Sequence, residues 1–158
     1  ANDSFINGSY SEVIALLAPL ERVYSKERRT NEMHYLLGFS YQMQGDQARA
    51  ISHYKSVQAN TSDTYFRKAN QQYARLLDKN GDTDKAIETL EMLTSYNLGN
   101  QALKRTLEDL ANLYLKAENY DQALDVVGRL RDNLMLDDDF ENRVTTEIEE
   151  QKKKVSRN

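Results

Sequence analysis

The sequence predicts an all-α fold built from repeated pairs of antiparallel helices. Four short segments predict it, because each joins a polar turn to the start of an apolar helical pattern. When they are aligned on Val13, Ala50, Ala86 and Ala123, the segments recur every 36 or 37 residues. A near-constant interval of this size is typical of helical-repeat proteins, in which each repeat packs on its neighbours.

Each turn segment carries a residue that can cap the helix after it. These residues are Ser9, Asp46, Asp82 and Asn119. Side-chain oxygens of these types accept hydrogen bonds from the free N–H groups of a first helical turn. Glycine precedes three of the caps and allows a left-handed end to the helix before it. Glu118 precedes the fourth cap, so we expect that turn to differ.

A further helical pattern stands before each of the last three turns. In each of these patterns a small residue directly follows a large one, and the small residues are Gly38, Ala74 and Ala111. A partner helix can approach closely at a small residue. Apolar residues recur at helical spacing after each turn as well, for example at Ala50 and Tyr54. The repeating unit is therefore helix, tight turn, helix.

The best-formed unit carries Leu37, Gly38, Tyr41, Ala50 and Tyr54 at the spacing of a known family. It resembles the tetratricopeptide repeat, and the resemblance extends roughly over residues 9–130. The resemblance implies a right-handed superhelical solenoid of antiparallel helix pairs. The units depart from the usual period of about 34 residues by two or three, and the proline that usually ends the second helix is absent from the full units.

We predict one solenoid over residues 1–158. Its parts are a half repeat at 9–24 with a second helix only, full repeats at 31–60, 64–96 and 101–132, and a capping helix at 138–155. Residues 1–8 are too short to supply a first helix. We therefore expect the chain to be part of a longer protein, or its first helix to be covered by another molecule.

The half repeat leaves apolar side chains without their usual partner. Exposing them is costly, so Val13, Ile14 and Leu17 are candidates for self-association. Pro19 lacks a backbone donor, and we expect the helix to kink or stop near Ala18.

Composition narrows the classes of function. With 21 basic and 25 acidic residues the net charge is −4, which disfavours nucleic acid as a partner. There is no cysteine, so disulfides and thiol chemistry are excluded. The longest apolar run, Val13 to Leu20, is far shorter than the ~18 residues of a membrane span. The amide-rich, cysteine-free composition favours a bacterial source and a soluble protein of the cytoplasm or the periplasm.

No catalytic or metal-binding pattern stands out. His34 falls on the face that packs on its partner helix, and we expect His53 on the outer surface, both in structural roles. Residues 78–89 imitate a calcium loop, but Thr83 replaces its glycine and Thr89 its bidentate glutamate, which favours a repeat turn. We predict no enzyme, no cofactor and no metal site.

The resemblance implies a concave groove lined by the first helix of each unit. The face that does not pack on the partner helix holds Tyr35, Phe39, Met43, Lys68, Gln71, Arg75, Lys79, Arg105, Asn112 and Lys116, with Glu32 and Glu108 beside them. The groove is then aromatic at one end and basic or polar further along. That suits a peptide with an apolar anchor and acidic side chains or a carboxylate.

Some members of the family hold a C-terminal carboxylate with a set of Lys, Asn and Arg residues, which this sequence does not reproduce, because Tyr35 and Phe39 stand in its places. Alternatively, the aromatic stripe of Tyr35, Phe39 and Met43 packs on a missing repeat. The main functional hypothesis is a non-enzymatic scaffold for protein–protein interaction. The alternatives are a structural spacer or self-associating segment, and an accessory region of a larger enzyme or of an envelope or secretion assembly.

Overall fold

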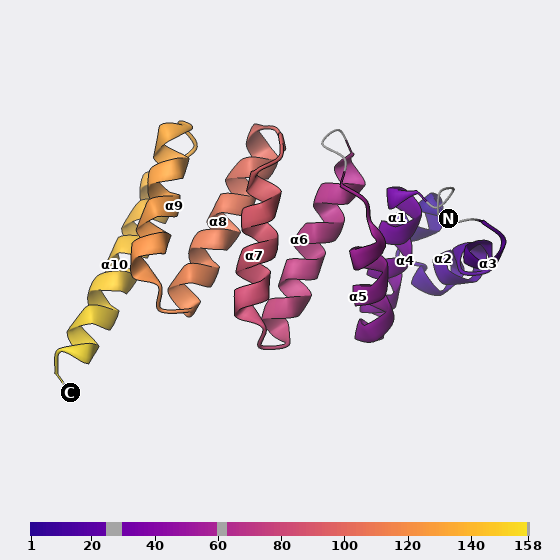
Figure 1. Cartoon of the computed structure of the whole chain (residues 1–158), viewed down its shortest axis with the longest axis horizontal. Coiled ribbons are helices and arrows are strands. Elements are labelled where there is room, and N and C mark those ends of the chain that lie inside the picture. Colours follow the sequence, from indigo (N-terminus) through magenta and orange to yellow (C-terminus); the bar gives the residue numbers. More distant parts are fainter. Residues whose placement is uncertain (25–29, 60–62, 158) are drawn as a thin grey trace. The chain divides into compact units, whose positions relative to one another are not determined.

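The computed structural model describes residues 1–24, 30–59 and 63–157. These ranges are helical and contain no strand, which confirms the predicted all-α fold. Their helices are α1 Asn2–Ile6, α2 Tyr10–Leu17, α3 Leu20–Val23, α4 Asn31–Met43, α5 Gln47–Ser56, α6 Thr64–Lys79, α7 Thr83–Thr94, α8 Asn100–Lys116, α9 Tyr120–Asp132 and α10 Asp138–Val155 (Figure 1).

The chain forms two compact units, residues 1–80 and 81–158. In the first unit α4 packs against α2, α5 and α6, and in the second α8 packs against α7 and α9 while α10 packs on α9 and α8. Packing between neighbours along the chain is what a helical repeat requires. The predicted repeat boundaries remain a prediction, and the predicted end of the first full repeat at residue 60 lies outside the described residues.

The turn between α8 and α9 has the same form as the turn between α4 and α5. The N–H groups of Gly45 and Asp46 bond back to carbonyls of α4 at 3.0 and 2.9 Å. Those of Glu118 and Asn119 bond back to α8 at 3.0 and 2.8 Å in the same pattern. Glu118 has a φ of 58° where Gly45 has 84°. The expectation that the last turn differs is therefore wrong, because Glu118 adopts the left-handed conformation itself.

Two of the four predicted caps act through their side chains. Asp46 and Asn119 each accept a hydrogen bond from the N–H three residues later, at 3.1 and 3.4 Å. Ser9 and Asp82 stand at the N-cap positions of α2 and α7 without such a bond. The carboxylate of Asp82 accepts a hydrogen bond from the ammonium of Lys85 at 2.5 Å instead.

The N-terminal helices close over the core of the first unit. Helix α2 ends at Leu17 and α3 begins after Pro19, which confirms the predicted stop. Val13 is fully buried in the core, so the prediction that it offers a self-association surface is wrong. Its burial follows from the packing of α2 on α4. Ile14 and Leu17 are partly buried against the same core.

Helices α4 and α5 pack tightly against each other at Gly38. A Cβ added at this glycine would lie 2.7 Å from the Cε1 atom of Tyr54 and 3.2 Å from the Cβ of His53. Tyr54 is 2% exposed, and its hydroxyl donates to the side-chain oxygen of Gln42 at 2.6 Å. The small residue predicted at this position is therefore a requirement of the packing.

A polar network holds the second unit together across three helices. The guanidinium of Arg129 in α9 donates to both carboxylate oxygens of Glu91 in α7, at 3.1 and 3.0 Å, and to the hydroxyl of Thr94 at 2.8 Å. The hydroxyl of Tyr114 in α8 donates to Glu91 at 3.0 Å. Both bonds to Glu91 come from the Nη1 nitrogen, and the opposite charges of the two groups make them stronger than bonds between neutral groups.

This network predicts a loss of stability in strong alkali. Burial, the hydrogen bond to Glu91 and the charge of that carboxylate, in this order, raise the pKa of Tyr114 to about 12 from 10.0. The raised pKa contributes stability in full below about pH 10, where Tyr114 is protonated in both states. As the pH rises towards about 12, the unfolded chain ionises before the folded one, and the contribution is lost.

Urea unfolding of wild type and Tyr114→Phe at several pH values measures this effect. The stability difference between the two proteins should shrink as the pH rises from about 10 towards about 12, because phenylalanine cannot ionise. The other tyrosines are present in both proteins, so their contributions cancel in the difference between the two free energies of unfolding. A difference that stays constant across this range would contradict the assignment.

Helix α10 spans Asp138–Val155 and is capped by the residue before it. Asp137 caps it by accepting a hydrogen bond from the N–H of Phe140 at 2.8 Å, and this bond is the main cause that lowers the pKa of Asp137. Val144 and Ile148 are buried, whereas the exposed side chains around them are polar. The three consecutive aspartates thus include a helix cap.

Candidate peptide-binding surface and histidine pocket

The aromatic stripe of α4 is covered by the N-terminal helix. The ring of Phe5 in α1 lies 5.9 Å from that of Tyr35 and 5.1 Å from that of Phe39, measured between centroids. Tyr10 lies 6.0 Å from Phe5, and Tyr65 lies 5.7 Å from Tyr35. We call these five residues the aromatic cluster. Residues 1–8 were expected to be too short to supply a first helix, but they contain α1, and its Phe5 covers part of the aromatic stripe.

Tyr35 offers almost no surface to a ligand. It is 8% exposed, and burial is the main cause that raises its pKa. The ammonium of Lys68 in α6 lies 5.8 Å from its ring centre and 5.6 Å from that of Tyr65. Lys68 is therefore engaged with the aromatic cluster by cation–π contacts. Met43, the last residue of the stripe, is 53% exposed.

The other predicted site residues of α6 differ in exposure. Gln71 is half-buried and accepts a hydrogen bond from the guanidinium of Arg67 at 3.3 Å. Arg75 and Lys79 are exposed, one helical turn apart on the same face. The first unit therefore presents two cations from the last part of α6, and the aromatic end of the predicted groove is filled by the chain itself.

The second unit presents its predicted site residues on α8. Arg105, Asn112 and Lys116 are exposed along one face of this helix. The side-chain oxygen of Asn112 accepts a hydrogen bond from the guanidinium of Arg143 in α10 at 3.0 Å. Arg143 was not among the candidate site residues predicted from the sequence. Arg143 is exposed on α10, next to the buried Val144.

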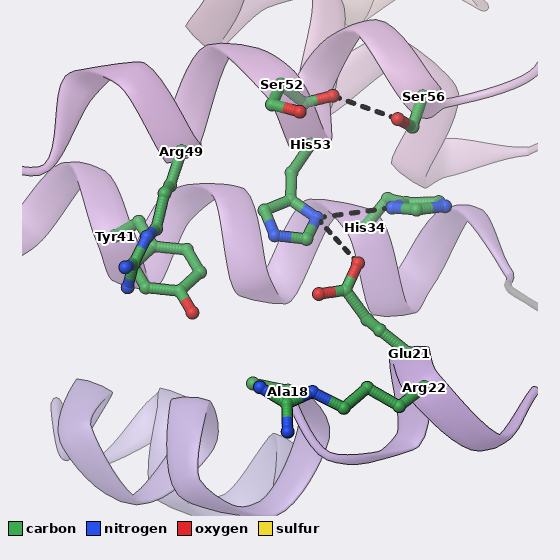
Figure 2. A pocket seen from close by; sticks show the side chains of 9 residues that line it. All are labelled: Ala18, Glu21, Arg22, His34, Tyr41, Arg49, Ser52, His53 and Ser56. Carbon is green, nitrogen blue, oxygen red and sulfur yellow. Dashed lines mark hydrogen bonds and ion pairs between the residues drawn. The ribbon is translucent and has the colours of Figure 1, made fainter.

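A polar pocket lies elsewhere in the first unit and brings together residues far apart in the sequence. Figure 2 shows the imidazoles of His34 from α4 and His53 from α5, with the carboxylate of Glu21 from α3 pointing towards them. The Nδ1 atoms of the two histidines are 3.3 Å apart. Nδ1 of His53 is 3.7 Å from Oε1 of Glu21.

His53 is 8% exposed and His34 is 7% exposed. The prediction that His53 lies on the outer surface is therefore wrong. It faces inward because α5 turns this residue towards α4 and because Glu21 of α3 covers it. Sequence patterns indicate little of this meeting, because the histidines are 19 residues apart and α3 is a single turn with no periodic pattern.

The pocket has a volume of about 580 Å³ and a polar lining. Arg22 and Arg49 bring positive charge to its walls, and Ser52 and Ser56 add hydroxyl groups. The ring of Tyr41 stacks on that of His53, with centroids 5.6 Å apart and an interplanar angle of 10°. The arrangement can coordinate a cation through its imidazoles or receive an anionic group beside the arginines.

The segment that imitates a calcium loop is a helix-to-helix turn. Asn80 ends α6, and Asp82 precedes α7 with its carboxylate bonded to Lys85. Among the described residues, the one set of three metal-ligating side chains close enough to hold an ion is Glu21, His34 and His53. In the same part of the chain, no helix has both the length and the apolar character that crossing a membrane requires.

The fold and the turn geometry define a helical-repeat protein. Residues 32–62 and 63–97 match the family model of the tetratricopeptide repeat, which together is less than half of the chain. These matches support the predicted resemblance to the tetratricopeptide repeat over residues 32–97. No curated protein matches the chain.

Proposed function

We propose that the chain is a non-enzymatic scaffold that binds an acidic peptide on the exposed face of α6. Tetratricopeptide repeats generally mediate protein–protein interaction. The observation that carries the proposal is the pair of exposed cations, Arg75 and Lys79, on one face of a helix in a matched repeat. Such a pair attracts carboxylates of a peptide and selects against basic partners.

We expect the apolar part of the ligand to bind the apolar surface that the aromatic cluster leaves exposed. Tyr35 and Phe39 are in contact with Phe5, so an apolar anchor has Met43 rather than the aromatic rings to bind. Met43 ends α4 and Lys79 ends α6, and these two helices pack on each other. Methionine adapts its shape to varied apolar partners, which suits a peptide-binding surface.

In the second unit, Arg105, Lys116 and Arg143 offer a further cationic surface for the same class of ligand. Arg143 contributes through its bond to Asn112, which holds its guanidinium beside α8. An acidic segment bound here needs no contact with the first unit, so each unit can be tested alone by substitution.

Charge reversal at the two exposed cations of α6 tests the proposal. Fluorescence polarisation would measure binding of labelled peptides that combine one large apolar residue with several glutamates. We expect the double variant Arg75→Glu, Lys79→Glu to bind about tenfold or more weakly, because two attractive charges become repulsive. Binding by the wild type should also weaken as salt rises.

The control is Lys153→Glu together with Lys154→Glu, which makes the same charge change at exposed positions of α10. Circular dichroism would verify that all variants are folded. Equal peptide affinity in the test and control variants would refute a role for this face, and so would the absence of binding by the wild type to every acidic peptide.

The self-associating spacer stays the alternative function. Val13 no longer supports it, since that side chain is buried, but Leu16 of the same helix is 54% exposed. Light scattering on the samples used for peptide binding separates the two functions. A monomer at high concentration leaves the peptide-binding scaffold, whereas a peptide-independent oligomer favours the alternative.

A further inference from the structure

We propose that Glu21, His34 and His53 bind one divalent transition-metal ion of the zinc class. The site lies in the polar pocket of the first unit, and it is independent of peptide binding on α6. Each residue offers one ligand atom, and the three atoms lie within 4.8 Å of one another. They come from α3, α4 and α5, so a bound ion would join three helices.

The distances fit a metal better than they fit unrelated neighbours. Zinc binds imidazole nitrogen at about 2.0–2.1 Å in tetrahedral sites, which places two such ligands about 3.3–3.4 Å apart. The Nδ1 atoms of His34 and His53 are 3.3 Å apart. Oε1 of Glu21 is 3.7 Å from Nδ1 of His53, and the three ligand atoms lie within 4.8 Å of one another, so the carboxylate must move closer to share an ion with both imidazoles.

The ligand types select the class of metal. Two imidazoles and one carboxylate suit zinc and neighbouring transition metals, whereas calcium and magnesium prefer oxygen ligands alone. The chain contains two histidines and no cysteine, and the fold buries both histidines in this one pocket. An ion that requires nitrogen ligands from side chains therefore has a single place to bind.

The surroundings prepare the ligands for coordination. Without a metal, the short Nδ1 to Nδ1 contact requires one imidazole to donate a proton to the other. A metal ion satisfies both nitrogens at once, and the Glu21 carboxylate offsets part of its charge. The stacked ring of Tyr41 fixes the plane of the His53 imidazole.

Three protein ligands leave a fourth position open towards the pocket. A water molecule can fill it. Arg22 and Arg49 line the same pocket, and their charge favours an anion at that position over a second cation. The structure therefore assigns the site to one ion with an exchangeable fourth ligand.

Titration calorimetry of the whole chain with zinc chloride tests the proposal. We expect one zinc ion per chain with an affinity in the micromolar range or tighter. His34→Gln and His53→Gln should each weaken binding about 100-fold, because each removes a direct ligand, and Glu21→Gln about tenfold or more. Glu150→Gln is the control, since it makes the same change at an exposed position of α10. Unchanged affinity in His34→Gln and in His53→Gln overturns the proposal.

Nuclear magnetic resonance of the wild type supplies a test that does not depend on the folding of variants. The two histidines give separate imidazole signals, and one equivalent of zinc should shift both, with reversal by a chelator. Zinc that leaves both signals in place overturns the proposal. If the Glu21→Gln variant binds zinc as tightly as the wild type, Glu21 is not a ligand, and the three-residue site is overturned.

Discussion

Substitution of Gly38 by alanine is expected to destabilise the first unit by about 1–3 kcal/mol, which is typical of one added carbon in a tightly packed core. The new Cβ would lie 2.7 and 2.9 Å from two ring carbons of Tyr54 and 3.2 Å from the Cβ of His53. The ring cannot move aside easily, because it is buried and its hydroxyl is bonded to Gln42. The gain of up to about 1 kcal/mol in helix propensity offsets only part of this cost.

Urea unfolding followed by circular dichroism measures the effect. The matched control is Gly128→Ala, because Gly128 lies inside α9 with nothing within 4 Å of an added Cβ. We expect this control to stabilise the chain by about 0.5–1 kcal/mol, since alanine is the better helix former. A stabilising effect of both substitutions would mean that α4 and α5 do not meet at Gly38 as described.

Replacement of Phe5 by alanine is expected to cost about 2–3 kcal/mol, somewhat less than the 3–5 kcal/mol of a fully buried phenylalanine. Phe5 is half-buried and contacts Tyr10, Tyr35 and Phe39 with its ring. Helix α1 has five residues, which is too short to be stable without tertiary contacts. Without the ring of Phe5, we expect α1 to detach and the aromatic stripe of α4 to become exposed.

Thermal unfolding measures the loss of stability, and hydrogen exchange shows where it occurs. Exchange should accelerate in α1 and along α4 and stay unchanged in α8. The control is Leu16→Ala, an exposed position of α2 for which we expect a change within about 0.5 kcal/mol. If Phe5→Ala proves as mild as the control, α1 does not cover the stripe, and Tyr35 and Phe39 become candidates for ligand contact again.

The sequence predicts the repeats well because their signals are local and repeated. Positions such as Ala50, Ala86 and Ala123 recur at helical spacing beside turn residues, and all three are fully buried. Helix α10 follows in the same way from its acidic start and from the spacing of Val144 and Ile148. Each of these inferences depends on residues within a few turns of one another.

The contacts that the sequence does not predict are made by short elements or by distant side chains. Helices α1 and α3 have five and four residues, too few for a periodic pattern, yet they cover Tyr35 and His53 through tertiary contacts. The bond between Glu91 and Arg129 joins residues 38 apart. At Glu118, the turn forms its backbone hydrogen bonds with a left-handed residue that is not glycine.

The candidate surface is predictable only in its outline. Helical spacing places Arg75 and Lys79 on one exposed face, as the structure has them. Spacing alone does not say that Tyr35 is covered, because the covering ring of Phe5 lies in another helix. The histidine pocket forms because side chains from three helices lie close together. The periodic pattern of one helix does not predict contacts between three helices.

Two residues in the left-handed conformation lower the stability of the second unit. Glu118 and Leu134 have φ values of 58° and 55°, and an ordinary side chain pays about 1–2 kcal/mol for this conformation. The turn between α4 and α5 uses Gly45 at the position that corresponds to Glu118, and glycine adopts this conformation without such strain. The second unit is therefore less stable than it could be at two exposed positions, and glycine at either position is a starting point for a more thermostable protein.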